Sequence, residues 1–290
     1  MNRVGVLALA VAAALPAAAQ QKVDETKAAA KDGTVEIHNV AGSVRVSGWD
    51  QAQVSVTGVL GRGTERLEFT TSERRAVIRV VLPHNAHHVD GSDLEIRVPQ
   101  GSSLEVNTVS ADVSVDKVSG EMDIESVSGG ISVGGEPKRF SARSVSGDVT
   151  ITAASAPGRA KSVSGDIKLA GVAGDVEAGS VSGTLSVKGD AVSRLDLETT
   201  SGDIRVDAGL AKDARVEAKT VSGTVELELP AATAADFDVT TFSGNITNDF
   251  GPAAKRTSEY GPGRELSFST GGGGRVVAKS FSGNVHLRKK

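Results

Sequence analysis

The stretch Val145-Ser146-Gly147-Asp148-Val149 decides the fold, because close copies of it recur along the chain. Its clearest copies begin at Val118, Val127, Val163, Val181 and Val221, and degenerate ones begin at Val40, Val109, Val172, Thr200, Phe242 and Phe281. The serines at 110, 119, 128, 146, 164 and 182 are 9, 9, 18, 18 and 18 residues apart. Self-similarity at a fixed period is typical of repeat architectures. The sequence therefore predicts a repeat of about 18 residues made of two unequal halves.

Apolar and polar residues alternate within each half of the repeat. We expect Val163, Gly165 and Ile167 to lie on the inner face, and Ser164 and Asp166 on the outer face. A period of two is that of a half-buried β-strand. Two short strands per repeat, stacked in register, predict an all-β fold. The specific prediction is a parallel β-solenoid with about 18 to 21 residues per regular coil.

Glycine recurs at one position, where we expect the chain to turn a corner into the strand. A missing Cβ there permits either a positive φ or a close approach of neighbouring backbone, and the sequence leaves both open. The predicted inward-facing structural glycines are Gly120, Gly129, Gly147, Gly165, Gly183, Gly202, Gly223, Gly244 and Gly283. The next residue is expected to point outward and to form a turn, as a ladder of short polar side chains. Its members include Asp148, Asp166, Asp203 and Asn245.

Composition and the first residues indicate an exported protein. The 290 residues include no cysteine, so no disulfide framework exists, and the net charge of -4 argues against a nucleic-acid partner. Residues 1–19 resemble a secretory signal, with Arg3 before an apolar run and Ala17-Ala18-Ala19 after it. The apolar run is too short to span a membrane. We expect a periplasmic or extracellular protein with no transmembrane segment in the mature chain.

The chain divides into three further segments by pattern. Residues 20–33 are polar and suggest a tether, and residues 34–100 suggest an N-terminal β region with wider coils. Within that region, residues 66–71 and 76–82 predict a hairpin. A small separate β-domain ending near Pro99 is the alternative. Residues 101–290 predict the regular solenoid, with a loop insertion near 248–263.

Several motifs together resemble a known bacterial family. They are the early strand at 42–50, the strand at 94–99, the iterated modules, and the Gly-rich turn before Phe281-Ser282-Gly283-Asn284-Val285. This combination, over roughly residues 34–287, resembles the putative-adhesin family known as the DUF4097 domain, which is related to LiaG-like proteins. The resemblance implies a β-solenoid protein of the cell envelope. It supplies no catalytic residues to assign.

Candidate ligand-binding groups are few. His84, His87 and His88, followed by Asp90 and Asp93, form the densest group of potential metal ligands, since imidazole and carboxylate bind zinc. Their spacing matches no standard site, so a polar loop is favoured and no metal is assigned. The aspartate ladder lacks the Gly-Gly-x-Gly-x-Asp pattern of calcium-binding repeats. Turn formation is therefore the favoured role of these aspartates.

The sequence favours a non-enzymatic exported scaffold or binding surface that needs no cofactor. Its partner would be an envelope protein or a glycan that the sequence does not identify. Sugar binding is the weaker version, because only Trp49 and Tyr260 offer amphipathic stacking surfaces. The alternative is a β-helical polysaccharide lyase or hydrolase that uses outer-face residues such as Asp148, Asp166, Lys168 and Arg205. Fold analogy alone does not establish that chemistry.

Overall fold

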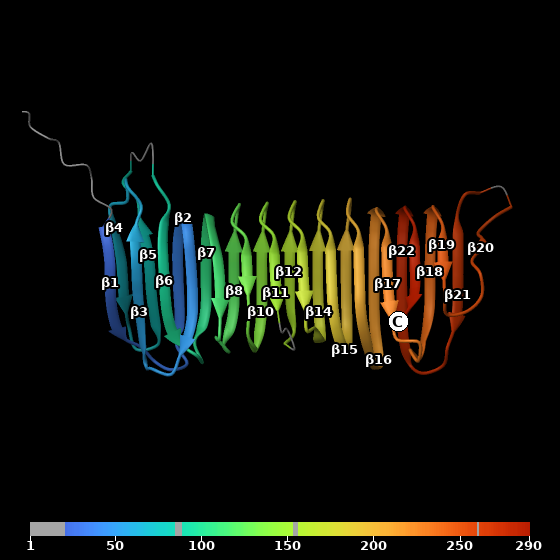
Figure 1. Cartoon of the computed structure of the whole chain (residues 1–290), viewed down its shortest axis with the longest axis horizontal. Helices are drawn as coiled ribbons and strands as arrows, with labels where there is room; N and C mark the ends of the chain where they lie inside the picture. Colours follow the sequence, from blue (N-terminus) through green and yellow to red (C-terminus); the bar gives the residue numbers. More distant parts are fainter. Residues whose placement is uncertain (1–20, 85–88, 153–155, 260) are drawn as a thin grey trace, which may run out of the picture.

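The computed structural model describes residues 21–84, 89–152, 156–259 and 261–290. Within these residues the chain forms twenty-three strands that join in one large mixed sheet, with no helix. The strands lie across the long axis of an elongated body, with the N-terminal strands at one end and the C-terminal strands toward the other (Figure 1). The all-β prediction is confirmed. No helix of the described residues is long and apolar enough to cross a membrane. The expected signal at 1–19 lies outside the described residues.

The N-terminal end is not stacked in chain order. Its strands are β1 (Gln21–Ala28), β2 (Thr34–Trp49), β3 (Gln53–Leu60), β4 (Arg66–Thr71), β5 (Arg75–Val81) and β6 (Ser92–Pro99). Strand β2 pairs in parallel with β5 and β6, and also with β7 (Ser103–Asp116). The antiparallel pairs β1–β3, β3–β6 and β4–β5 complete this end, and the last of them confirms the predicted hairpin. The predicted tether is wrong for residues 21–28, because β1 pairs along its whole length with β3 and buries Val23.

The middle of the molecule is parallel and regular. Its remaining strands are β8 (Glu121–Ser126), β9 (Ile131–Val133), β10 (Arg139–Ser144), β11 (Val149–Thr152), β12 (Gly158–Ser162), β13 (Ile167–Ala170), β14 (Ala173–Ser180) and β15 (Leu185–Thr199). Equivalent strands of successive repeats pair in register, with Phe140 opposite Gly158 and Val149 opposite Ile167. The apolar side chains of each strand alternate into one continuous core. Parallel stacking therefore buries the apolar side chains that a single repeat would leave exposed.

The C-terminal end departs from chain order again. Its strands are β16 (Ile204–Ser222), β17 (Val225–Leu229), β18 (Ala235–Ser243), β19 (Ile246–Asn248), β20 (Lys255–Arg256), β21 (Arg264–Ser269), β22 (Gly274–Ser282) and β23 (Val285–Lys289). Strand β22 pairs in parallel with both β16 and β18, and β23 pairs with both β17 and β19. Strands β20 and β21 add antiparallel pairs beyond β18. The last strands in sequence are thus inserted between earlier ones.

The repeat glycines lie where neighbouring backbones touch. A Cβ on Gly165 would stand 2.1 Å from the carbonyl oxygen of Gly147, and one on Gly183 would stand 2.0 Å from that of Gly165. None of the nine repeat glycines has a positive φ. Close backbone approach therefore accounts for glycine here, and left-handed geometry does not. Five of the glycines, from Gly120 to Gly183, are buried, and Gly202, Gly223, Gly244 and Gly283 are half-buried.

One part of the predicted alternation is wrong. Val163 was expected to point inward with Gly165 and Ile167, yet its side chain is 44% exposed while Ile167 is 1% exposed. Strand β12 ends at Ser162 and β13 begins at Ile167, so the chain bends through the intervening residues and the period of two does not continue across them. The valines at 109, 127, 145, 181 and 221 are exposed in the same way, whereas Val118 and Val172, which begin other copies of the module, are buried.

Candidate binding surface

The exposed valines align into a continuous surface feature, which we call the apolar ladder. Its rungs are 44 to 57% exposed. In stacking order they are Val109, Val127, Val145, Val163, Val181, Val221, Phe281 and Phe242. Thr200, which is also exposed, occupies the rung between Val181 and Val221. Neighbouring strands lie about 4.8 Å apart, so nine rungs extend over roughly 40 Å. An exposed apolar feature of this length is a candidate interaction surface.

A recurrent turn holds the rungs from Val127 to Val181 outward. The hydroxyl oxygen of Ser162 accepts a hydrogen bond from the amide of Gly165 at 2.8 Å, and Ser144 and Ser180 do the same for Gly147 and Gly183. Backbone pairing between repeats continues through the bend, since the amide of Ser164 donates to the carbonyl of Val145 at 2.9 Å. The two residues between serine and glycine therefore project from the corner. The Ser/Thr-x-x-Gly spacing is visible in the sequence, and reading it as a side-chain turn would have revealed the ladder.

The predicted outward ladder of short polar residues bonds one repeat to the next. The amide of Asp166 donates to Oδ1 of Asp148, and the amide of Thr184 donates to Oδ1 of Asp166, each at 2.9 Å. Asp203 accepts from the amide of Thr224, and the Asn245 amide donates to Asn284, also at 2.9 Å. Asp148 and Asn245 are exposed, and Asp166 and Asp203 are half-buried. The carboxylates thus accept hydrogen bonds from backbone amides of the next repeat, rather than from amides of their own turn.

The apolar ladder ends in a groove at its C-terminal rungs. Phe242 and Phe281 stack with ring centroids 4.9 Å apart and planes at 8°. With Val221 they form one side of a cavity of about 490 Å³. The strand residues Lys219, Lys279 and Thr240 also line it, as do Thr257, Gly263 and Arg264 from the segment around β20 and β21. The segment in which the sequence predicts a loop insertion, near 248–263, thus contributes to the lining.

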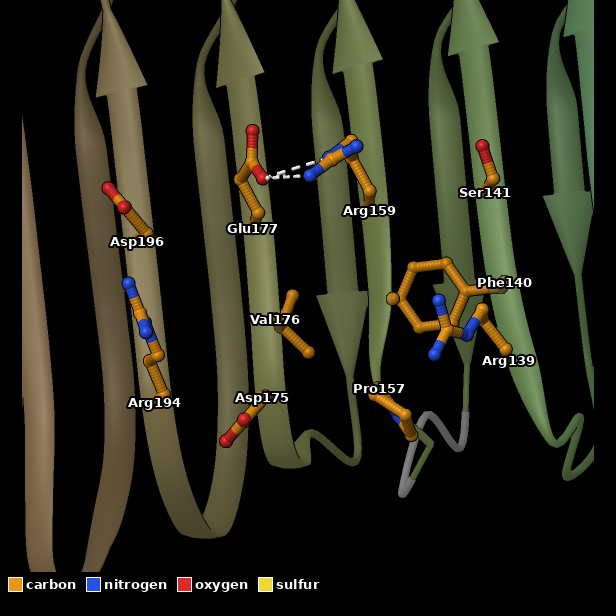
Figure 2. Close-up of a pocket in the computed structure, with 11 residues that line it drawn as sticks. Arg139, Phe140, Ser141, Pro157, Arg159, Asp175, Val176, Glu177, Arg194 and Asp196 are labelled. Carbon is orange, nitrogen blue, oxygen red and sulfur yellow. Dashed lines mark hydrogen bonds and ion pairs between the residues drawn. The ribbon is translucent and has the colours of Figure 1, made fainter.

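A second groove lies on a charged face of the middle repeats (Figure 2). It measures about 410 Å³ and runs across β10, β12, β14 and β15. Glu177 accepts hydrogen bonds from Arg159 and Lys161, each at 2.8 Å. The bond from the Lys161 ammonium, and then that from Arg159, lowers the pKa of the Glu177 carboxyl. Glu177 is therefore ionised at neutral pH and is unsuited to act as a general acid.

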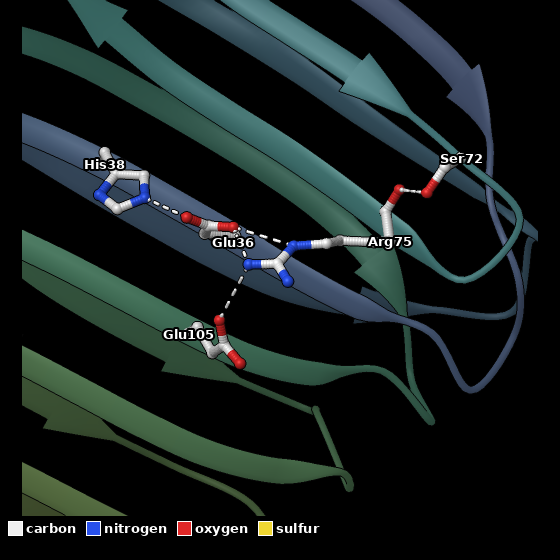
Figure 3. Close-up of polar contacts among 5 residues, drawn as sticks. All are labelled: Glu36, His38, Ser72, Arg75 and Glu105. Atoms are coloured by element: carbon white, nitrogen blue, oxygen red, sulfur yellow. Dashed lines mark hydrogen bonds and ion pairs between the residues drawn. The ribbon is translucent and has the colours of Figure 1, made fainter.

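A charged cluster joins non-consecutive strands at the N-terminal end (Figure 3). Glu36 on β2 receives a hydrogen bond from His38 at 2.5 Å and is paired with Arg75 on β5. Arg75 also lies 3.6 Å from Glu105 on β7. The hydrogen bond from His38, followed by that from Arg75, lowers the pKa of the Glu36 carboxyl. The cluster connects three strands that are distant in sequence.

The remaining sequence candidates are separated or outside the described residues. His84 is exposed in a loop, whereas His87 and His88 lie outside the residues that the structure describes. Among the described residues, no three His, Asp or Glu side chains gather as metal ligands do. Asp148 and Asp166 are engaged with backbone amides, and Arg205 pairs with Asp203 at 2.8 Å. Trp49 donates to the carbonyl of Gln53, and Tyr260 is outside the described residues.

Comparison with protein families decides the relationship. The family model described as Toastrack DUF4097 matches residues 24–288, which is most of the chain. The chain belongs to this family. The sequence resemblance is thereby confirmed, and it extends to β1, which the motif comparison did not reach. A search of curated proteins found no match.

Solved structures of similar proteins include three from Bacteroides fragilis and Parabacteroides distasonis. A putative adhesin from Bacteroides fragilis is 10% identical, with 92% of this chain and 97% of that chain covered and a TM-score of 0.43. A putative adhesin from Parabacteroides distasonis is 12% identical over 92% and 97%, with a TM-score of 0.44. A structure from the same organism, described as a putative lipid binding protein, is 13% identical over 94% and 98%, with a TM-score of 0.45.

Proposed function

We propose that this member of the Toastrack DUF4097 family is a non-enzymatic, exported binding scaffold. The observation that carries the proposal is the apolar ladder, whose rungs stay exposed at equivalent positions from Val109 to Phe242. Burial of apolar area is the main favourable term in protein association, so a repeated exposed rung favours an extended partner over a small substrate. The partner would be an envelope protein or a glycan, reached after export to the periplasm or the cell surface.

The proposal includes a parallel β-solenoid as the scaffold. In-register pairing of strands 18 residues apart supports it, as do the side-chain bonds from one repeat to the next. We assign residues 1–19 to a signal peptide, 34–100 to a wider N-terminal β region and 101–290 to the regular solenoid. The repeat glycines and the Asp148, Asp166, Asp203 and Asn245 ladder are assigned structural roles.

Binding by the apolar ladder is tested by removing rungs from its middle. A triple variant with Val145→Ser, Val163→Ser and Val181→Ser keeps the fold, because all three side chains are about half exposed. The matched control replaces the exposed Lys168 and Glu125 on other faces with serine. Immobilised protein is incubated with glycan arrays and with fractionated bacterial envelope. We expect the triple variant to lose at least tenfold in affinity for the retained partner, and the control variant to lose none. Equal retention by both variants contradicts a binding role for the ladder.

The alternative function, a β-helical polysaccharide enzyme, is tested by turnover. The purified protein is incubated with acidic polysaccharides, and released oligosaccharides or unsaturated products are measured. The scaffold proposal expects no product. Product release that disappears in Asp166→Ala, while the variant remains folded, would replace the scaffold with an enzyme.

A further inference from the structure

The groove at the C-terminal rungs differs from the rest of the apolar ladder in three ways. Its rungs are the stacked rings of Phe281 and Phe242, whereas the rungs from Val109 to Val181 are valines. Its lining also includes Thr257 and Gly263, from the segment between β20 and β21. Basic side chains are part of the lining. The same few strands therefore combine a wide apolar strip with positive charge.

The charge at the groove is unbalanced in favour of cations. The described lining residues include Lys219, Lys279 and Arg264 against one carboxylate, Glu198. Lys219 on β16 lies beside Glu198 on the neighbouring strand β15 and beside Lys279 on the other neighbouring strand, β22. Glu217 forms an ion pair with Lys219 at 2.6 Å, and Glu265 lies one strand beyond Thr240. Lys279 thus lies between Lys219 and Thr240 on neighbouring strands, two residues before Phe281 on β22.

The shape of the apolar strip selects among ligands. The two phenylalanine rings are nearly parallel and in contact, so each covers one face of the other and the ring edges face outward. Sugars stack on exposed aromatic faces, and the stacking of the two rings on each other leaves less of these faces exposed. The strip from Val221 to Phe242 spans three strands, or about 10 Å, and a flexible hydrocarbon chain fits a narrow ridge of ring edges and methyl groups. A volume of about 490 Å³ is within the usual range of small-molecule sites.

We propose that this groove binds a single-chain anionic amphiphile. The hydrocarbon chain lies along Val221, Phe281 and Phe242, and the anionic head group, a phosphate or a carboxylate, lies at Lys279 with Lys219 and Arg264. This site deepens the proposed binding function, since it names one ligand class for the C-terminal end of the apolar ladder. The middle rungs remain available to a larger partner.

Binding is measured on the full chain by calorimetry, with alkyl phosphates below their micelle concentrations. Lengthening the chain from octyl to decyl phosphate should tighten binding about fourfold for each methylene that enters the groove, which corresponds to ~0.8 kcal/mol. Dodecyl maltoside, which has a neutral head, should bind at least tenfold more weakly than dodecyl phosphate. Inorganic phosphate alone should not bind measurably at the same concentrations. Decanoate distinguishes a carboxylate-selective site from a phosphate-selective one.

Matched variants locate the site. A double variant with Phe242→Ser and Phe281→Ser should abolish the dependence on chain length, and Lys279→Gln should remove the preference for the charged head. The control Lys168→Gln, on another face, should leave binding unchanged. All replaced side chains are exposed, and unchanged melting temperatures verify folding. Equal binding of charged and neutral amphiphiles, or equal binding by the phenylalanine double variant, overturns the inference.

Different results would contradict the scaffold proposal and the amphiphile site. If alkyl phosphates do not bind while the Val145, Val163 and Val181 variant still loses its envelope partner, the amphiphile site is wrong and the scaffold stands. If alkyl phosphates bind with the expected selectivity and the middle rungs prove irrelevant to any partner, the binding function is confined to the C-terminal groove.

Discussion

Glycine at the corner of each repeat is required by contact between backbones. A Cβ on Gly165 would overlap the carbonyl oxygen of Gly147, and that carbonyl belongs to the equivalent glycine of the preceding repeat. Neither backbone can withdraw without disturbing the hydrogen bonds on both sides of the bend. The constraint is therefore transmitted from one repeat to the next along the stack.

The first prediction compares two glycines that occupy different positions of the repeat. Gly165→Ala should destabilise the protein by about 1 to 3 kcal/mol, because the added methyl group has no space. Gly130→Ala is the matched control, since a Cβ there would meet its nearest atom, Asp112 Oδ1, at 3.6 Å. That substitution should be neutral or slightly stabilising. Thermal unfolding of both variants measures the difference, and equal melting temperatures would contradict the close-approach explanation.

The second prediction concerns the aspartates between repeats. Asp166→Ala removes the acceptor for the Thr184 amide and should cost about 1 kcal/mol or somewhat more, as expected for a hydrogen bond to a charged group. Asp166→Asn keeps a side-chain oxygen at the same place and should recover most of the loss. Thr184→Ala, at the next ladder position, serves as the control. Urea unfolding of the three variants is the measurement, and an Asp166→Ala variant as stable as Thr184→Ala would rule out the bond as a stabilising contact.

At the scale of the strand, the cluster of Glu36, His38 and Arg75 fixes β2 against β5. The Glu36 side chain is 13% exposed, so its ion pair is shielded more than an ordinary surface pair. A carboxyl whose pKa is lowered on folding adds stability that is fully present above its unfolded pKa, about 4.3, and is lost as pH falls through the folded value. Acid should therefore loosen the N-terminal strands.

The third prediction follows from the direction in which the pKa of Glu36 is shifted. Glu36→Gln should lower the melting temperature by a few degrees at pH 6, and the difference from the wild type should shrink as pH falls below about 4.3. The reason is that the wild-type carboxyl is protonated first in the unfolded chain and then, at lower pH, in the folded protein, so that both proteins finally lack the charge. Glu95→Gln, at an exposed position of β6, is the control and should show little effect at either pH. A Glu36→Gln deficit that stays constant down to pH 3 would contradict the assignment.

The sequence predicted the elements of the middle repeats because one pattern is repeated there without interruption. The alternation of apolar and polar residues predicts strand β13, and the 18-residue repeat predicts its parallel partner β11 and the glycine at Gly165. The exposed rung at Val163 did not follow, because the bend at Ser162 breaks the alternation through a side-chain hydrogen bond. The groove at Phe242 and Phe281 depends on which strands are neighbours at the C-terminal end. Hydrophobic pattern alone does not encode the insertion of β22.

At the scale of the whole molecule, the parallel middle lies between two ends that contain antiparallel strands. Strand β1 pairs only with β3, β4 only with β5, and β20 only with β21 among the described strands. Strand β13 instead has a partner on each side, β11 and β15. In a stacked array, stability depends on contacts with both neighbours.

The fourth prediction is a gradient in amide exchange. Peptides from β1, β4 and β20 should exchange hydrogen for deuterium faster than peptides from β11 and β13, because fewer bonds must open at the ends. Mass spectrometry of a deuterium time course measures the gradient on the full chain. In the Gly165→Ala variant, the additional exchange should be centred on β11, β12 and β13. Exchange that rises uniformly over all strands would indicate that the repeats unfold as a single cooperative unit.

The position of β22 has a consequence for the order in which the molecule is made. Strands β16 and β18 each use β22 as a parallel partner, so both keep an open edge until residues 274–282 have been synthesised. A nascent chain that has released residues up to Thr270 therefore exposes a vacant slot between two strands that are already formed. The β22 of another molecule would complete the same hydrogen bonds, which is the starting point of strand exchange between identical chains. If β22 of the same chain pairs with β16 and β18 quickly, the molecules stay separate. If β22 of another chain pairs there first, two intertwined chains result, so the rate of this pairing matters more than the stability of the strand itself.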